Sequence, residues 1–295
     1  MKKIKDTRLI RVAEVYECIY ETYRNRNILI LVAGPGSDGS YMLETAQEFS
    51  KYGNSYVIVQ EIFRSRYPKK PEINPKSHLD DLIIEVSEDL LNFEQENNLT
   101  NIVTAGHCLM GLISLYYGEI SKNVERSFLI STPAKPLGFS FKNMMRLFYV
   151  LCKNGFFRSL KNPEVSRKAM MDYLLLSSNM YFYDKTKSRQ YMQIFIDSLK
   201  DSSPEFIQAV ITKGIKPCPD LSRVIPDKRK TKQGVVYIEG EFEEMAGKGD
   251  FEFLKRYLEE KGYQHISREI IPDSKHFCFM ENPDFFNKTI GRYLK

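Results

Sequence analysis

The sequence has 295 residues, of which 42% are hydrophobic and 27% are charged. These values are ordinary for a globular protein with a buried core, and they exclude a mainly disordered or low-complexity chain. The net charge of +5 comes from basic and acidic residues spread along the chain, which argues against a nucleic-acid partner. At about 150 residues per domain, the length predicts one large domain or one domain with an inserted subdomain.

Neither a membrane span nor a secretion signal is expected. No apolar run approaches the roughly 18 residues of a membrane-spanning helix. The charged start of the sequence, MKKIKDTRLIRV, is not followed by the apolar stretch of a signal peptide. The five cysteines form no CxxC pair and no metal-ligand spacing, so we expect reduced thiols in a cytoplasmic protein. No metal and no cofactor are expected.

Strands and helices alternate in the first half of the sequence. A stretch rich in Val, Ile and Tyr at residues 8–24 predicts one or two antiparallel strands. Short apolar runs predict buried strands at residues 28–32, 56–59, 101–105 and 126–131, with helical patterns between them at residues 41–51, 80–96 and 108–117. This alternation is typical of a parallel sheet with helices on both faces.

Residues 133–233 interrupt the alternation. They hold helical patterns rich in Met, Phe and Tyr and no convincing buried strand, so we predict an inserted helical subdomain. The alternation resumes with a strand at residues 235–238, a helix at 251–261, a strand at 265–271 and a helix at 283–294. Residues 1–132 and 234–295 are therefore expected to form one core.

The most informative segment is NIVTAGHCLMG at residues 101–111. A buried strand runs into Gly106 and Cys108 and then directly into a helix, which is the context of a nucleophile elbow. The sharp turn of an elbow requires small residues near the nucleophile. Gly106 meets this requirement two residues before Cys108, whereas Met110 does not meet it two residues after, and Gly111 supplies the small residue one position later.

Together with this elbow, several segments resemble the α/β-hydrolase fold, in the layout of lid-bearing proline iminopeptidases, epoxide hydrolases and C–C hydrolases. The sequence AGPG at residues 33–36 resembles their oxyanion loop, GEFE at 240–243 their acid turn, and KH with the following ENP at 275–283 their histidine-bearing end. The resemblance covers residues 8–132 and 234–295. It implies a mostly parallel eight-stranded sheet flanked by helices, with residues 133–233 as a helical lid.

The resemblance also implies a catalytic triad of Cys108, Glu243 and His276, in the chain order nucleophile, acid, histidine. Glu243 matches the family spacing, and its neighbour Glu244 stays an alternative acid. His276 follows the last predicted strand, from which it can reach the nucleophile. The other three histidines are interpreted as structural: His78, His107 and His265. Cys108 is either the native nucleophile or an engineered replacement of the serine that the family carries at this position.

The chemistry that this triad implies is acyl transfer. A helix N-terminus and a neighbouring histidine both stabilise a thiolate, whose attack on an acyl carbonyl leads to a thioester. The N–H groups of Leu109 and of the loop at Gly34 are expected to stabilise the oxyanion. The enzyme either hydrolyses an ester, thioester or amide or passes the acyl group to an amine, alcohol or thiol. The expected partner is a small-molecule acyl substrate, free or bound to a carrier as a thioester.

The predicted lid contributes mostly its own apolar core. A minority of its side chains, for which we name Met144, Phe148 and Met180, is expected to contact an apolar substrate. Two other interpretations stay open: a catalytically inactive ligand-binding protein of the same fold and, ranked lower, an aminopeptidase of the proline iminopeptidase type. The glycine pattern at residues 34–39 also occurs in dinucleotide-binding proteins, but the acidic residue that they carry after the second strand is missing.

Overall fold

A central β-sheet organises the computed structural model of the chain, which describes residues 2–4, 12–18, 26–31, 37–60, 79–135, 141–200, 202–205, 207–208, 221–225, 233–246 and 249–295. In these residues the sheet has eight strands in the order β1-β2-β4-β3-β5-β6-β7-β8. The strands are β1 Lys2–Ile4, β2 Val12–Cys18, β3 Asn27–Leu31, β4 Asn54–Gln60, β5 Ile102–His107, β6 Val124–Ile130, β7 Gly234–Gly240 and β8 His265–Ile271.

Six neighbouring strands of the sheet are mutually parallel: β4, β3, β5, β6, β7 and β8. At the β4 side, β2 pairs antiparallel with β4, and β1 pairs antiparallel with β2. The antiparallel strand predicted within residues 8–24 is thus present as β2, whereas β1 was not predicted. Because the parallel strands share one direction, their carboxyl ends meet at one edge of the sheet, where ligands bind in open α/β sheets.

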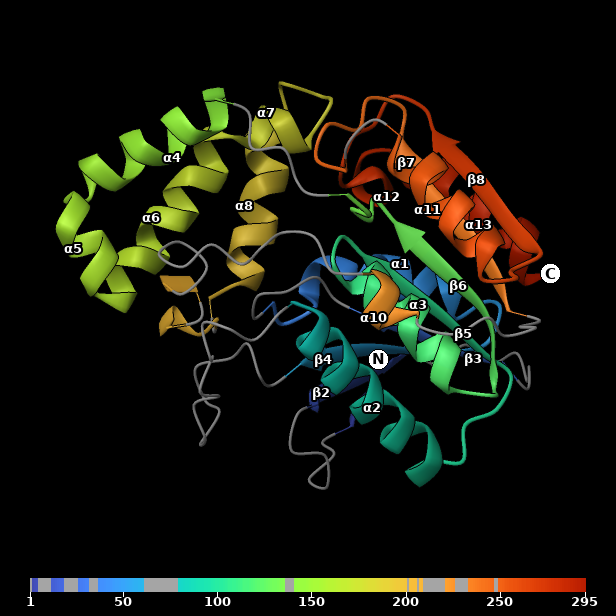
Figure 1. The fold of residues 1–295 in the computed structure, drawn as a ribbon. Helices are drawn as coiled ribbons and strands as arrows, with labels where there is room; N and C mark the ends of the chain where they lie inside the picture. The colour runs from blue at the N-terminus through green and yellow to red at the C-terminus, as the bar shows by residue number, and fades with distance from the viewer. Residues whose placement is uncertain are drawn as a thin grey trace.

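Helices cover both faces of the sheet (Figure 1). One apolar cluster contains the helices α2 Leu79–Glu96, α3 Met110–Ile120, α10 Leu221–Val224 and α11 Asp250–Glu260. The other contains η1 Ser40–Met42, α1 Leu43–Phe49, α12 Cys278–Glu281 and α13 Pro283–Leu294. Alternate residues of β3 belong to the two clusters, Leu29 and Leu31 to the first and Ile28 and Ile30 to the second. This division explains why the strand is apolar at every position.

Five helices between β6 and β7 form what we call the helical insertion: α4 Phe141–Lys153, α5 Phe156–Lys161, α6 Pro163–Leu176, α7 Ser178–Tyr181 and α8 Ser188–Ser198. Figure 1 shows them beside the sheet, with α5 at the outer end and α7 near α12. Phe182, Met192 and Phe195 join the second core cluster, so the inner part of the insertion packs on the core. Val150 and Leu151 of α4 instead pack on Ala169 and Tyr173 of α6.

Most predicted elements appear close to their predicted positions. The strand at residues 265–271 and the helix at 283–294 have the predicted bounds. The helix predicted to begin at Cys108 begins at Met110 instead, because Cys108 lies in a turn. Among the described residues, no helix has both the length and the apolar character needed to cross a membrane.

Candidate active site

The turn between β5 and α3 has the geometry of a nucleophile elbow. β5 is buried along its whole length, Leu109 caps α3, and Cys108 lies between them with a backbone φ of 55°. Positive φ is uncommon for a residue with a side chain, and strained backbone of this kind concentrates at functional sites. Cys108 is partly exposed, whereas the flanking His107 and Met110 are buried. The turn therefore brings the thiol to the accessible side, at the N-terminus of α3.

Two glycines allow this turn. A Cβ atom at Gly106 would overlap the carbonyl oxygen of Met110, and a Cβ atom at Gly111 would overlap the Thr132 hydroxyl just after β6. Gly111 therefore supplies the close approach that the sequence analysis assigned to it. Met110, one residue earlier, is fully buried in the first core cluster.

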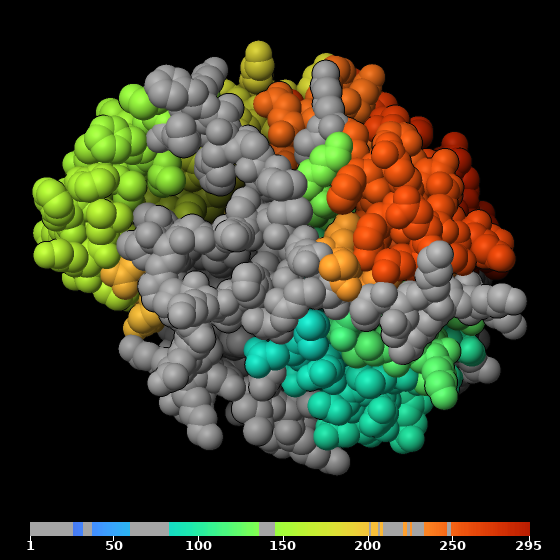
Figure 2. Space-filling model, in the orientation of Figure 1, coloured from blue at the N-terminus to red at the C-terminus, as the bar shows by residue number. Residues whose placement is uncertain are grey.

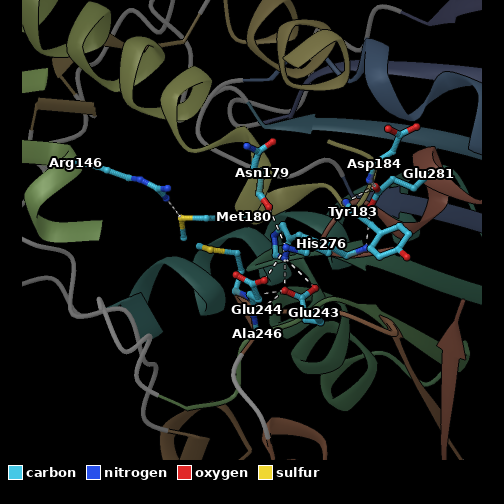
Figure 3. Close-up of polar contacts among 12 residues, drawn as sticks. Arg146, Asn179, Met180, Tyr183, Asp184, Glu243, Glu244, Ala246, His276 and Glu281 are labelled. Carbon is cyan, nitrogen blue, oxygen red and sulfur yellow. Dashed lines mark hydrogen bonds and ion pairs between the residues drawn. The ribbon is translucent and has the colours of Figure 1, made fainter. Parts of the chain in front are cut away.

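Glu243 and His276 form a buried pair at the carboxyl edge of the sheet (Figure 3). The Nδ1 atom of His276 lies 3.2 Å from Oε2 and 3.3 Å from Oε1 of Glu243, and the two side chains are only 5% and 3% exposed. The backbone N–H groups of Met245 and Ala246 also donate to the same carboxylate, at 2.6 and 3.1 Å. The carboxylate is thus held in one orientation from both sides.

Gly240 explains how the two loops come together. It ends β7, and a Cβ atom at this position would overlap the carbonyl oxygens of Ser274 and Lys275, immediately before His276. The absence of a side chain lets the turn that carries Glu243 lie directly against the loop that carries the histidine.

Glu244, the alternative acid, pairs with a lysine instead of the histidine. Its side chain is 56% exposed, and its Oε1 atom lies 2.6 Å from the Nζ atom of Lys275. Of the two adjacent glutamates, the structure brings only Glu243 to His276.

The charges around His276 favour its protonated form. Burial by itself lowers the pKa of His276, but the charges on Glu243 and Cys108 and hydrogen bonds with both side chains outweigh burial and raise it to about 10. Burial likewise tends to raise the pKa of Glu243, but the charge of His276 and the hydrogen bonds to the carboxylate hold it below its usual value. Since Nδ1 faces Glu243, Nε2 is the ring nitrogen left for the Cys108 sulfur.

His107 forms a hydrogen bond with the backbone of His276. Its Nε2 atom donates to the carbonyl oxygen of His276 at 3.0 Å, which requires a proton on Nε2. Burial and the charge of His276 keep the pKa of His107 well below its usual value, so the ring stays neutral. It packs against Phe277, with ring centroids 4.7 Å apart. No local sequence pattern indicates this contact of His107.

The helical insertion contacts the histidine loop directly. The His276 N–H donates to the carbonyl oxygen of Tyr181 at 3.1 Å, and Lys275 Nζ donates to that of Asn179 at 2.9 Å. The Glu281 carboxylate accepts from the N–H groups of Lys275, at 2.8 Å, and Tyr183, at 2.5 Å (Figure 3). Glu281 therefore joins the insertion to the loop. The ENP pattern marked this segment in the sequence, but nothing there indicated its partners.

The remaining predicted site residues belong to the predicted oxyanion hole and the predicted lid. Leu109 caps α3, and its N–H forms no hydrogen bond with the described residues. Gly34 lies outside the described residues. Met180 is 9% exposed, and its sulfur accepts from Arg146. Phe148 is 52% exposed and packs against Phe156. Met144 lies in α4, but its side chain is outside the described part.

No cluster of three or more His, Cys, Asp or Glu side chains that could hold a metal ion occurs within the described ranges of the chain. The three cysteines whose side chains are described, Cys108, Cys152 and Cys278, are free thiols.

Comparison with known proteins identifies the fold. No protein-family model matches the sequence, and no curated protein is significantly similar to it. Among solved structures, the enol-lactonase from Burkholderia xenovorans LB400 is similar with a TM-score of 0.66 and 16% identity, over 95% of this chain and 96% of that one. An esterase from Exiguobacterium antarcticum has a TM-score of 0.63 and 15% identity, over 95% of both chains.

A third similar structure is 2-hydroxy-6-oxo-6-phenylhexa-2,4-dienoate hydrolase from Rhodococcus sp. strain RHA1. It has a TM-score of 0.64 and 14% identity, over 91% of this chain and 89% of that one. These similarities extend over nearly the whole chain, and the predicted fold class is confirmed: the chain has the α/β-hydrolase fold.

Proposed function

We propose that this protein is an acyl-transfer enzyme in which Cys108, His276 and Glu243 form the catalytic triad. The observation that carries the proposal is the buried His276–Glu243 pair, whose ring is electrostatically coupled to Cys108 at a nucleophile elbow. A histidine oriented by a carboxylate and facing a nucleophile is the arrangement that activates serine and cysteine enzymes. The similar structures named as esterase, lactonase and hydrolase support the same class.

The first half-reaction forms a thioester. The Cys108 thiolate attacks the carbonyl carbon of the substrate and forms a C–S bond, and the resulting oxyanion accepts a hydrogen bond from the Leu109 N–H. When the tetrahedral intermediate collapses, the bond to the leaving alcohol, thiol or amine breaks. The leaving group takes the proton from Nε2 of His276, which is protonated at the start because of its raised pKa.

The second half-reaction releases the acyl group. Neutral His276 removes a proton from water or from another acceptor, which attacks the thioester carbonyl, and the C–S bond breaks to regenerate the thiolate. Thioesters react readily with amines and thiols, so transfer and hydrolysis are both open to this enzyme. We propose a small-molecule acyl substrate, free or carrier-bound, with the helical insertion as the lid that contacts its apolar part. A reducing cytoplasm suits an enzyme that depends on a free thiol.

The identity of the product tests this proposal. The protein would be incubated with acyl thioesters and p-nitrophenyl esters of graded chain length, with and without an added primary amine, and the products identified by mass spectrometry. Free acid alone assigns a hydrolase, and an amide assigns an acyltransferase. If every ester class stays intact while an acyl ligand still binds, the protein is a non-catalytic ligand-binding member of the fold.

A further inference from the structure

Helix α4 exposes an apolar face to solvent. Met145, Phe148 and Tyr149 are 48, 52 and 60% exposed, and their spacing of three and four residues places them on one side of the helix. The opposite side carries Val150 and Leu151, which are buried against α6. Helix α4 thus has two apolar sides, of which one is packed against α6 and the other is exposed to solvent.

The exposed apolar surface continues into α5. Phe157 is 75% exposed, the highest value among the exposed large hydrophobic side chains of the described residues. The rings of Phe148 and Phe156 lie 5.7 Å apart, and those of Phe156 and Phe157 lie 5.5 Å apart. We call Met145, Phe148, Tyr149 and Phe157 the aromatic face. Figure 2 shows α4 and α5, in yellow-green, at the outer edge of the molecule.

The sequence around this face contains basic residues and no acidic ones. The segment 141–162 contains five basic residues and no Asp or Glu: Lys142, Arg146, Lys153, Arg158 and Lys161. The nearest acidic residues in the sequence are Glu125 and Glu164. Arg158 and Lys161 are exposed and form no ion pair with the described residues. The segment alone therefore has a charge of +5, equal to the net charge of the whole chain.

We propose that the aromatic face binds the surface of a lipid bilayer that contains anionic lipids. A basic amphipathic helix with aromatic side chains lies in the bilayer interface, with its apolar side chains among the acyl chains and its basic groups at the phosphates. The aromatic face extends over two consecutive helices, α4 and α5. A fluid lipid surface accepts protruding rings anywhere, whereas a protein partner needs matching pockets. Binding through this face does not depend on the proposed acyl-transfer activity.

Sedimentation with vesicles tests the proposal on the full chain. We expect the protein to sediment with vesicles of phosphatidylcholine mixed with phosphatidylglycerol and to stay in solution with phosphatidylcholine alone. The double variant Arg158→Gln/Lys161→Gln should bind about 25-fold more weakly, at about fivefold for each basic residue removed. Phe148→Ser/Phe157→Ser should bind at least about tenfold more weakly.

Matched controls come from other exposed residues of the same chain. Phe253 and Phe285 are 40 and 39% exposed, and Lys288 and Lys295 are exposed on the core. The variants Phe253→Ser/Phe285→Ser and Lys288→Gln/Lys295→Gln should bind the mixed vesicles as the unchanged protein does. Equal binding to both kinds of vesicle, or equal losses in the control variants, would overturn the proposal.

A fluorescence measurement locates the contact. The chain contains no tryptophan, so Phe157→Trp introduces a single reporter on the aromatic face. Its emission should shift to shorter wavelength with the mixed vesicles, and that of Phe285→Trp should not. If the aromatic face instead joins two copies of the chain or captures a carrier protein, ultracentrifugation will show a complex that the Phe148→Ser/Phe157→Ser variant loses, and vesicles will not shift the emission. That result would replace the lipid proposal.

Discussion

Glu243 and Glu244 are neighbours with the same side chain, yet they have different surroundings. Glu243 is buried against His276, and Glu244 is exposed and paired with Lys275. The sequence favoured Glu243 by spacing alone. The structure adds the physical distinction, because two backbone N–H groups hold the Glu243 carboxylate toward the ring.

Exchanging each glutamate for glutamine separates their roles. Glu243→Gln should slow acylation by about 100-fold or more, because the ring loses the negative charge that orients it and stabilises its protonated form. Glu244→Gln should change the rate by less than about threefold, since it removes only an exposed ion pair. Stopped-flow acylation with an activated ester measures both. Equal effects of the two changes would contradict the assignment of Glu243.

The raised pKa of His276 predicts a dependence on pH. Protonated His276 acts as the acid for the leaving group, so acylation should fall as the pH rises through about 10. In Glu243→Gln the ring loses its largest favourable charge, and the alkaline limb should move to lower pH. The stability of the fold should depend on pH in the same direction. Because folding raises the pKa of His276, its protonation stabilises the folded state fully below its usual pKa of 6.5, and this stabilisation is lost as the pH rises through about 10.

Two measurements test this dependence of acylation and stability on pH. The pH profile of acylation gives the position of the alkaline limb in both proteins. Urea unfolding of the unchanged protein and of His276→Gln should show a stability difference that narrows with rising pH. An alkaline limb that does not move in Glu243→Gln would show that the carboxylate does not set the protonation of the ring.

At the scale of elements, the elbow depends on the contact between α3 and the end of β6. Gly111→Ala should destabilise the fold by about 1–3 kcal/mol, because the added methyl group overlaps Thr132. Thr132→Gly removes the side chain that it meets, so Gly111→Ala should cost less in that background. Urea unfolding of the two single variants and the double variant gives this difference. If Gly111→Ala lowers the free energy of unfolding equally in both backgrounds, the overlap with Thr132 is not the cause of the destabilisation.

The sequence predicted the elements of the core well because their signals are local. Buried strands such as β3, predicted at residues 28–32 and observed at Asn27–Leu31, are short and bounded by turns. The last helix begins with Asn282, whose side chain accepts from the Phe285 N–H, and with Pro283 at its first turn. The strand β1 and the helix α12 were missed, because three or four residues are too few to show a period.

Local sequence patterns also predicted part of the candidate site. The elbow, the acid turn and the histidine loop each carry a local pattern, and the structure brings Cys108, Glu243 and His276 together, although their catalytic role stays a prediction. The contact of Glu281 with Tyr183 and that of His276 with Tyr181 each join residues about 100 positions apart. No local pattern encodes such contacts.

At the scale of the whole molecule, Glu281 couples the helical insertion to the histidine loop. Glu281→Gln keeps the size of the side chain but replaces one of its two acceptor oxygens with a donor. We expect the maximal rate of acylation to fall about tenfold, because a hydrogen bond to a charged group is lost beside His276. The KM should change little, and the alkaline limb of the pH profile should move to lower pH.

The matched control for this change is Glu260→Gln, an exposed glutamate at the end of α11. It should leave the rate and the pH profile as they are. If Glu281→Gln lowers stability but leaves the pH profile unchanged, Glu281 supports the fold without positioning the histidine.

The role of Cys108 as the nucleophile is tested most directly by the mass of the intact protein after brief exposure to a panel of acyl thioesters and p-nitrophenyl esters, beside a Cys108→Ala variant. We expect a mass increase of one acyl group in the unchanged protein and none in Cys108→Ala, with slower loading in His276→Gln. An adduct that persists in Cys108→Ala, or turnover without any dependence on Cys108, would contradict the assignment of Cys108 as the nucleophile.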